Sequence, residues 1–346
     1  MENILFLYRE IMPYNIPVLE EIVKIGYCIT VFHDTKKKLT PYLPPKIDNV
    51  VFISKEKYNR RDLAKYAISL KPKVVFVSDR TNPKYNYTAV LLRRRLNIHI
   101  ISGCDTQWRG GKQWFNVFTS WFRHKRFFSH ILISGMRQYE YAKKLGFPND
   151  KILWPLYSAN IQNFIHNKID REKFQQPRNF LFVGRFAKVK GLDILLQAWE
   201  KVPEKRGATL TLIGNGPLKE KLNYPEDVKI HDFMDQEELI KYSARASCFV
   251  LPSVFEAWAL VIQEFAAAGL PLIVTSTCGA TPHFVINNFN GFIVRKNEVD
   301  ELSAALARII SMPSDTLVEF ARRSRELSYS ISPKMVAYAI TSVVKK

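Results

Sequence analysis

Short apolar runs of about five residues recur along the chain and alternate with segments of helical periodicity. In the first half the apolar runs cover residues 4–8, 28–32, 50–54, 74–78, 98–102 and 130–134. Segments with apolar residues every three or four positions lie between several of them, at 17–26, 60–70, 87–96 and 136–146. Continuous apolar strands that alternate with helices are typical of a parallel sheet covered on both faces.

The alternation restarts after a polar interval at residues 167–179. New apolar runs cover residues 180–184, 209–214, 228–233, 247–252, 270–275 and 291–294. We therefore predict an α/β protein with two doubly wound, Rossmann-like domains, residues 1–168 and residues 169–328. Ligands of such sheets bind beyond the carboxyl ends of the strands, so we expect the site in the cleft between the two domains.

Composition places the chain among globular proteins of a reducing compartment. The 346 residues are 47% hydrophobic, which is enough for a sizeable core. The four cysteines lie far apart, so they form neither a zinc motif nor a disulfide framework. The longest apolar tract, residues 257–275, is interrupted by polar residues, glycine and proline, and residues 1–15 do not resemble a signal peptide. We therefore expect a cytoplasmic protein.

The net charge of +19 is concentrated in the first half of the chain. Residues 1–170 contain 28 Lys and Arg against 13 Asp and Glu, a difference of +15, and the remainder contributes +4. This imbalance predicts an anionic partner, which could be nucleic acid, acidic lipid or a phosphorylated substrate. We find no nucleic-acid-binding motif, which argues against the first.

Segment 109–128 mixes basic and aromatic residues. Helical spacing puts Trp114, Phe118, Trp121 and Phe122 near one stripe. Such a stripe can be the buried face of a core helix, or it can lie on an anionic membrane. The basic run Arg93–Arg95 and the charge of this half favour peripheral contact with a membrane.

Two loops in the second half suit a phosphate or a flat ligand. The first follows the run at 180–184 and contains Gly184, Arg185, Lys190 and Gly191. It lacks the Walker spacing, but two cations beside a helix N-terminus can bind an anion; a plain turn with solvated side chains is equally compatible. The second has Gly214 and Gly216 after a strand, which permits a tight turn.

The apolar stretch 253–271 contains two carboxylates, Glu256 and Glu264. A buried charge without a partner is unfavourable, so both side chains must face water or a hydrogen-bonding group. Carboxylates accept hydrogen bonds from sugar hydroxyls, as acidic residues do with ribose in dinucleotide folds. The following loop contains Gly279 and can offer backbone N–H groups to a phosphate.

In this order, these motifs resemble the nucleotide-sugar domain of the retaining family 4 glycosyltransferases, which have the GT-B fold. The resemblance covers residues 179–295. Its motifs are G-R-x4-K-G at 184–191, G-x-G at 214–216, E-x7-E at 256–264, AAAGLPLIVT at 266–275, a Gly/Pro loop at 279–282 and NGFIV at 290–294. It implies a GT-B protein with a last helix, residues 329–346, that packs back on the first domain.

The resemblance also assigns roles to individual residues. Arg185 and Lys190 would bind the donor diphosphate and stabilise the leaving group, Glu264 would hold the ribose, and Glu256 would orient the transferred sugar. Donor-binding positions would be Gly184, Gly214, Asn215, Gly216, Ala259, Leu260, Glu264 and Gly279. Fixed cations suffice to stabilise the diphosphate, so we expect neither a metal nor a cofactor.

The chain departs from the family pattern at four positions. Ala257 and Ala259 stand where the family has glycines, and a methyl group at these positions requires a negative φ. His283 replaces a glutamate. In the first domain Cys104 stands in the place of a histidine, so that Asp105 is the candidate acceptor-side or sugar-contacting residue.

The resemblance implies a retaining, metal-independent hexosyltransferase that uses a nucleotide-diphosphate sugar. The basic first half predicts a glycan acceptor that is linked to a lipid, as in the synthesis of bacterial surface polysaccharides, and a protein bound to the inner face of the cell membrane. Two other hypotheses remain open: a basic nucleic-acid-binding protein, and another GT-B enzyme such as a nucleotide-sugar epimerase.

Overall fold

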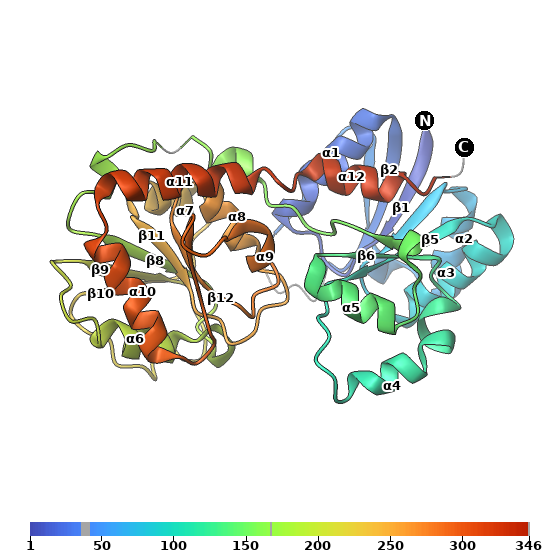
Figure 1. The fold of residues 1–346 in the computed structure, drawn as a ribbon. Coiled ribbons are helices and arrows are strands. Elements are labelled where there is room, and N and C mark those ends of the chain that lie inside the picture. Colours follow the sequence, from blue (N-terminus) through green and yellow to red (C-terminus); the bar gives the residue numbers. More distant parts are fainter. Residues whose placement is uncertain (36–41, 167, 345–346) are drawn as a thin grey trace. The chain divides into compact units, whose positions relative to one another are not determined.

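The computed structural model describes residues 1–35, 42–166 and 168–344 (Figure 1). Asn167 of the predicted linker and residues 345–346 of the predicted last helix lie outside the described residues. The chain forms two compact units, the first from Met1–Ser158 together with Ile331–Lys346 and the second from Ala159–Ser330. The first crossing between the units therefore lies before the polar interval in which the sequence placed the linker.

The first unit contains a sheet of seven parallel strands. The strands are β1 (Glu2–Leu7), β2 (Tyr27–His33), β3 (Val50–Ser54), β4 (Val74–Val77), β5 (His99–Cys104), β6 (His130–Ile133) and β7 (Ile152–Leu153). Their order, β3-β2-β1-β4-β5-β6-β7, reverses direction between β1 and β4. The helices are α1 (Ile16–Ile25), α2 (Arg60–Ser69), α3 (Pro83–Leu96), α4 (Gln113–Phe118), α5 (Met136–Lys144) and α12 (Pro333–Thr341), with a π-helical turn at Trp121–Lys125.

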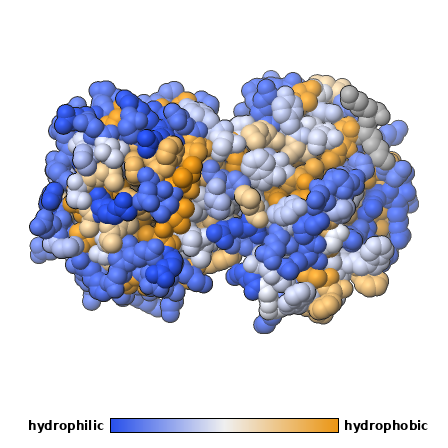
Figure 2. Space-filling view, viewed as in Figure 1, coloured by the Kyte–Doolittle hydropathy of each residue, from blue (hydrophilic) through white to orange (hydrophobic). Residues whose placement is uncertain are grey.

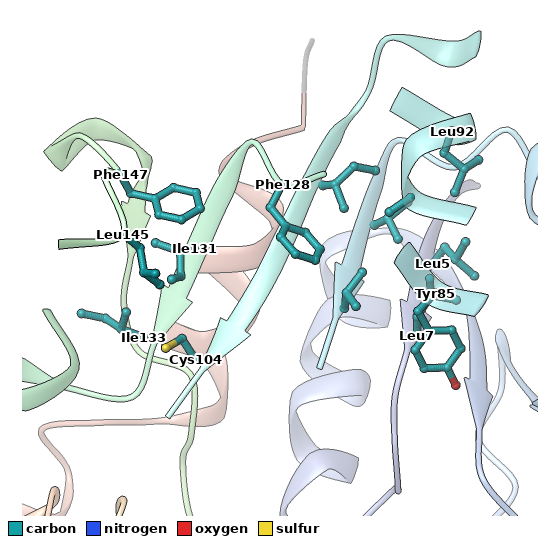
Figure 3. Packing of buried hydrophobic residues seen from close by; sticks show 14 of the residues in the cluster. Leu5, Leu7, Tyr85, Leu92, Cys104, Phe128, Ile131, Ile133, Leu145 and Phe147 are labelled. Atoms are coloured by element: carbon teal, nitrogen blue, oxygen red, sulfur yellow. The ribbon is translucent and has the colours of Figure 1, made fainter. Parts of the chain in front are cut away.

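Alternate residues of the strands build an apolar layer on each face of this sheet, as the two-residue period of a strand requires. Leu5 and Leu7 belong to one layer, part of which is drawn in Figure 3, and Ile4 and Phe6 belong to the other. Helix α12 contributes Val336, Ala337 and Ile340 to the second layer. It packs against α1, so two segments from opposite parts of the sequence complete this layer (Figure 1).

The second unit contains a sheet of six parallel strands. They are β8 (Asn179–Val183), β9 (Thr209–Ile213), β10 (Val228–His231), β11 (Cys248–Leu251), β12 (Leu272–Thr275) and β13 (Gly291–Val294), in the order β10-β9-β8-β11-β12-β13. The helices are α6 (Leu192–Glu200), α7 (Gln236–Arg245), α8 (Leu260–Ala267), α9 (Thr281–Phe284), α10 (Val299–Ser311) and α11 (Ser314–Ser328). Helix α6 packs with α10, and α8 packs with α11 (Figure 1).

Both sheets confirm the predicted α/β class with two doubly wound, Rossmann-like units. Every apolar run predicted as a strand forms one, with bounds shifted by up to two residues. The predicted helix over the aromatic segment is confirmed in part, because α4 ends at Phe118 and a π-helical turn follows at Trp121–Lys125. Within the described residues, no helix combines the length and the apolar character needed to cross a bilayer.

Candidate functional site

The second sheet reverses its strand order between β8 and β11, and the loops that follow these two strands contain three of the predicted residues. In parallel sheets this switch point is where the loops diverge and leave room for a ligand. Arg185 and Lys190 follow β8, and Glu256 follows β11. The topology therefore brings together side chains that are 66 residues apart in the sequence.

A close approach of the backbone holds these two loops together. Gly191 has a φ of +67° at the start of α6, and a Cβ atom there would lie 2.2 Å from the carbonyl oxygen of Pro252. Only glycine tolerates both the left-handed conformation and this contact. The amide N–H of Val254 also donates to the carbonyl oxygen of Val189 at 2.9 Å. The glycine of the G-R-x4-K-G motif therefore fixes the distance between the Lys190 loop and the Glu256 loop.

The ammonium group of Lys190 forms an ion pair with a carboxylate oxygen of Glu256. Their side chains are 19% and 21% exposed, so the pair is accessible at the edge of the sheet rather than sealed in the core. The predicted cation and the predicted sugar-binding carboxylate are thus direct partners. This pairing could not be predicted from the local sequence, because no basic residue lies near Glu256 along the chain. A ligand at this edge can contact both charges.

Arg185 lies on the rim of an adjoining pocket of about 340 Å³. The wall includes Gly214 and Asn215 after β9, and its apolar part includes Phe233 and Leu239. Arg185 is exposed, and no carboxylate pairs with it in the described part of the chain. A pocket with an exposed guanidinium at its mouth and an apolar interior suits a flat ring that carries an anionic group.

Two glycines shape this pocket. Gly214 and Gly216 have φ values of +149° and +156°. A Cβ atom at Gly214 would lie 2.0 Å from the carbonyl oxygen of Gly184, and one at Gly216 would lie 2.5 Å from that of Phe186. The loops after β8 and β9 therefore touch through backbone atoms, which explains why this G-x-G spacing is required here.

Glu264 lies in α8, within the apolar stretch 253–271. Gln236, the first residue of α7, donates to its carboxylate at 3.4 Å and accepts from the side chain of Asn163 at 3.1 Å. Burial raises the pKa of Glu264 from 4.5 to about 7, and the Gln236 hydrogen bond opposes the shift. Among the described residues, this weak hydrogen bond is the one given for the carboxyl group, which is therefore suited to accept hydroxyl hydrogen bonds from a ligand.

Ala257 and Ala259 were expected to have a negative φ, and Ala259 does not. This residue is the N-cap of α8 and has a φ of +79°, in the left-handed region. Leu260 is the first residue of the helix. The N–H of Gly279 donates to the carbonyl oxygen of Glu256 at 3.0 Å, so in this structure Gly279 holds the Glu256 loop.

Asp105 belongs to the first unit and follows β5 at the carboxyl edge of that sheet. It accepts a hydrogen bond from the Tyr157 hydroxyl at 3.3 Å, and Tyr14 packs edge-on against Tyr157. Burial, followed by the charge of Asp105, raises the pKa of Tyr14 to about 12. The sequence analysis missed both tyrosines, because nothing in their local sequence marks them as neighbours of Asp105.

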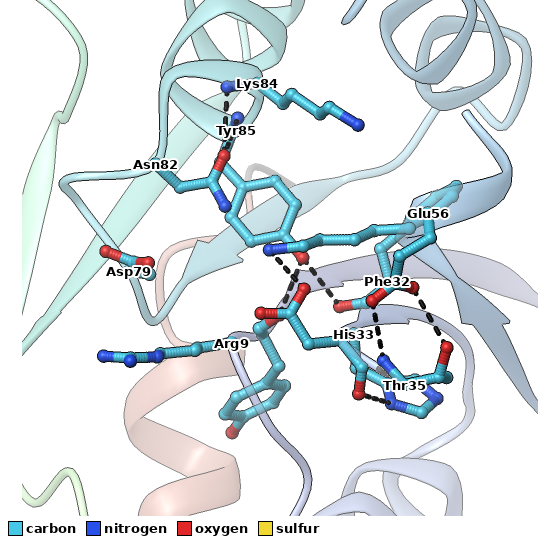
Figure 4. A network of polar contacts seen from close by, with 12 residues as sticks. Arg9, Phe32, His33, Thr35, Glu56, Asp79, Asn82, Lys84 and Tyr85 are labelled. Carbon is cyan, nitrogen blue, oxygen red and sulfur yellow. Dashed lines mark hydrogen bonds and ion pairs between the residues drawn. The ribbon is translucent and has the colours of Figure 1, made fainter. Parts of the chain in front are cut away.

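A second polar cluster occupies the same edge of the first sheet (Figure 4). Lys55 forms an ion pair with Asp34, and Glu56 accepts from the backbone N–H of Thr35 at 2.9 Å. The Tyr85 hydroxyl donates to the carbonyl oxygen of Tyr8 at 2.7 Å. Tyr85 belongs to α3 and the other groups follow β1, β2 and β3, so these contacts tie the strand ends to one another and to the helix.

Comparison with known proteins agrees with this architecture. Residues 164–327 match the family model described as "Glycosyl transferases group 1". The amylovoran biosynthesis glycosyltransferase AmsK of Erwinia amylovora is 28% identical over 170 residues, which cover 45% of this chain and 42% of that protein. The chain spans about half or less of the length of the first curated relatives it matches.

Two solved structures share the fold over nearly the whole chain. A glycosyltransferase from Rickettsia africae superposes with a TM-score of 0.78 at 14% identity, covering 100% of this chain and 99% of that one. HepE from Anabaena, solved with UDP and glucose, superposes with a TM-score of 0.72 at 14% identity, covering 99% of each chain. Residues 164–327 of the second unit are therefore similar to the glycosyltransferase group 1 domain, and the chain has the GT-B fold.

Proposed function

We propose that the protein is a glycosyltransferase that moves a sugar from a nucleotide-diphosphate sugar to a glycan acceptor. The observation that carries this proposal is the Lys190–Glu256 pair next to Gly184, which together with Arg185 lines a pocket suited to a nucleoside base. A base in the pocket, a diphosphate at the two cations and a sugar at Glu256 would follow one another in the order of a nucleotide sugar. HepE was solved with such a nucleotide, UDP.

In the proposed reaction the bond between the sugar C1 and the diphosphate oxygen breaks, and a bond from C1 to an acceptor hydroxyl oxygen forms. The acceptor proton passes to the leaving diphosphate. Arg185 and Lys190 stabilise the charge that develops on the diphosphate, and Glu256 orients the sugar. Glu264 accepts hydrogen bonds from the ribose hydroxyls. We further propose that the configuration at C1 is retained and that no metal takes part.

The first unit, with Asp105, is the proposed acceptor domain. We propose that the acceptor is a lipid-linked glycan in the synthesis of a bacterial surface polysaccharide. The name of the relative AmsK, an amylovoran biosynthesis glycosyltransferase, supports this class of acceptor. Its exposed aromatic surface, defined as Trp114, Phe115, Phe118, Trp121 and Phe122, supports a cytoplasmic protein that binds the inner face of the membrane.

The donor site is tested by thermal shift against nucleoside diphosphates and their sugars, without metal, and then by donor turnover with glycan acceptors. One nucleotide and its sugars should raise the melting temperature, because a ligand of the native state stabilises it by mass action. Arg185→Ala and Lys190→Ala should lower turnover by at least about 100-fold, as expected when a donor to a developing charge is lost. Lys188→Ala, on the same 3-10 turn, is the matched control and should retain activity.

Three results would contradict the proposal. The first is no stabilisation by any nucleotide. The second is full turnover by Arg185→Ala and Lys190→Ala. The third is release of nucleoside diphosphate at the same rate with and without a glycan acceptor, which would indicate another GT-B enzyme such as an epimerase.

A further inference from the structure

A second pocket lies at the opposite edge of the first sheet from Asp105. It has a volume of about 380 Å³ and is lined in part by His99, Ser129 and Lys151. His99 begins β5, while Ser129 and Lys151 immediately precede β6 and β7. The pocket therefore lies at the amino ends of these strands, whereas the proposed acceptor residue Asp105 follows the carboxyl end of β5.

Three cations line this pocket, and the fold constrains two of them. Arg93 of α3 donates from its guanidinium to the carbonyl oxygen of Lys125 at 3.0 Å and to that of Arg126 at 3.4 Å. The side chain of Lys125 passes over Gly146, where an added Cβ would lie 2.9 Å from its Cε atom. Lys151 is the third cation that lines the pocket. Arg93 and Lys125 are thus held at the pocket by backbone contacts and packing, not only by their position on the surface.

The lining contains no carboxylate. Within the described ranges, the acidic partner of these cations is Asp150, at 3.5 Å from Lys151, and its side chain is 71% exposed. The positive potential reaches the neighbouring His130: burial, then the charges of His99, Lys151 and Arg93, lower its pKa to about 4. A concave site with three cations and no lining acid favours an anion that can accept from several donors, such as a phosphate group.

The rim of the same pocket continues into the exposed aromatic surface. Trp121 lines the pocket and is 67% exposed, Phe122 beside it is also 67% exposed, and Phe118 is 78% exposed. Figure 2 shows apolar residues, in orange, at the surface over α4. Large aromatic side chains beside lysine and arginine are typical of surfaces that lie at the boundary between lipid head groups and acyl chains.

We propose that this pocket binds the phosphate group of an anionic lipid, with a phosphomonoester head group favoured, while Trp121 and Phe122 enter the interfacial layer. Arg93, Lys125 and Lys151 then surround the phosphate. This proposal rests on the membrane contact of the proposed function and adds a head-group site to it. The site is separate from the donor pocket and from Asp105, so a lipid bound there is an anchor and not a substrate.

The test is vesicle flotation of the full chain at three lipid compositions. Vesicles of phosphatidylcholine alone are compared with vesicles that also carry phosphatidic acid, a phosphomonoester, or phosphatidylglycerol, a phosphodiester, at matched surface charge. The wild type should bind the phosphatidic acid vesicles most tightly. Lys125→Gln/Lys151→Gln should lower this binding about 25-fold, at roughly fivefold for each cation removed, and should abolish the preference for the monoester.

The matched control is Arg94→Gln/Arg95→Gln, which removes two exposed cations from the same helix as Arg93 but outside the pocket. It should weaken binding to both anionic vesicles alike and keep the preference. Trp121→Ala/Phe122→Ala should lower binding to every vesicle. The nucleotide thermal shift, measured on each variant, verifies folding and tests the donor site independently of the lipid result.

Several outcomes overturn the proposal. If the wild type binds the two anionic lipids equally, or if the pocket and control variants lose the same amount of vesicle binding, the protein has a membrane-binding surface but no head-group site. If glycerol phosphate raises the melting temperature only when Lys125 and Lys151 are present, and the protein binds no vesicle, the pocket binds a soluble phosphate instead of a lipid. Absence of all binding, with a normal nucleotide shift, rejects both the pocket and the membrane contact while leaving the proposed donor site intact.

Discussion

Glu264 occupies an environment that favours its protonated form. Its carboxyl group is packed in α8 with one weak amide partner, and its pKa is raised to about 7. In the unfolded chain the pKa returns to near 4.5. Between these values the folded protein holds a proton that the unfolded chain has lost, so the free energy of unfolding decreases as the pH rises from about 4.5 to about 7.

Glu264→Gln should therefore flatten the pH dependence of stability in the ligand-free protein. The variant should unfold at nearly the wild-type denaturant concentration at pH 5 and should be about 2 kcal/mol more stable at pH 8. Urea unfolding followed by circular dichroism at both pH values measures this. Glu237→Gln, at an exposed position in the first turn of α7, should change stability by less than about 0.5 kcal/mol at either pH. A parallel pH dependence in wild type and Glu264→Gln would show that Glu264 is solvated.

Ala259 carries a side chain on a backbone conformation that favours glycine. Its φ of +79° places Cβ close to the following carbonyl group. Ala259→Gly should stabilise the protein by about 0.5–1 kcal/mol, since the relief of strain exceeds the added entropy of the unfolded chain. Ala257→Gly, where φ is negative, should destabilise it by a similar amount. Thermal unfolding of both variants measures these changes in stability. Destabilisation by Ala259→Gly would show that the alanine is not strained at this position.

The identities of the charged residues in the second unit were predictable from motif spacing, but their pairing was not. Glu256 has no basic neighbour in its own segment, and its partner Lys190 comes from the loop of the adjacent strand. The same holds for Glu264 and Gln236, on different helices. Local patterns indicate which strand end a residue occupies, whereas contacts across strands depend on the order of the strands in the sheet.

At the scale of elements, the loops after β8 and β9 depend on direct backbone contact. Gly214→Ala would place a Cβ 2.0 Å from the carbonyl oxygen of Gly184, so the two loops must separate. We expect a loss of about 3 kcal/mol in stability and loss of nucleotide binding. Gly207→Ala is the control: its φ is +74°, but the nearest atom lies 3.4 Å from the added Cβ, so the loss should be about 1 kcal/mol.

Calorimetric melting temperatures with and without nucleotide measure both effects. Equal losses in the two variants would show that conformational strain alone, and not the contact with Gly184, makes Gly214 necessary.

The strands were predictable because buried parallel strands are continuous apolar runs. Strand β7 was missed because it has two residues, Ile152 and Leu153, and no run marks it. The aromatic segment differs from one continuous helix for another reason. Its residues have helical spacing, but none of the residues of α4 is buried, and the helix ends at Phe118. A periodic stripe predicts a helix only where packing holds it together.

At the scale of the whole molecule, the first unit is built from two separate segments of the chain. Ile340 of α12 is 1% exposed and lies in the apolar layer that also contains Leu19 and Ile22 of α1. Ile340→Ala should destabilise the first unit by about 2–4 kcal/mol. Tyr338→Ala, at a side chain that is 51% exposed on the same helix, should change stability by less than about 1 kcal/mol.

Hydrogen exchange locates the effect. Amides of β1 and β4 should lose protection in Ile340→Ala, while those of β8 and β11 should keep it, because each unit has its own core. Equal loss of protection in both sheets would show that α12 stabilises the molecule as a whole rather than its own unit.

The position of α12 also sets an order of events during synthesis. The ribosome completes Ala159–Ser330, a continuous unit, before it makes Ile331 and the residues of α12. The second unit can therefore fold while the first still exposes the apolar side of α1, although the first was translated earlier. In the nascent protein, the second unit is complete before the unit that precedes it, and that earlier unit depends on chaperones or on its own partial structure until α12 emerges.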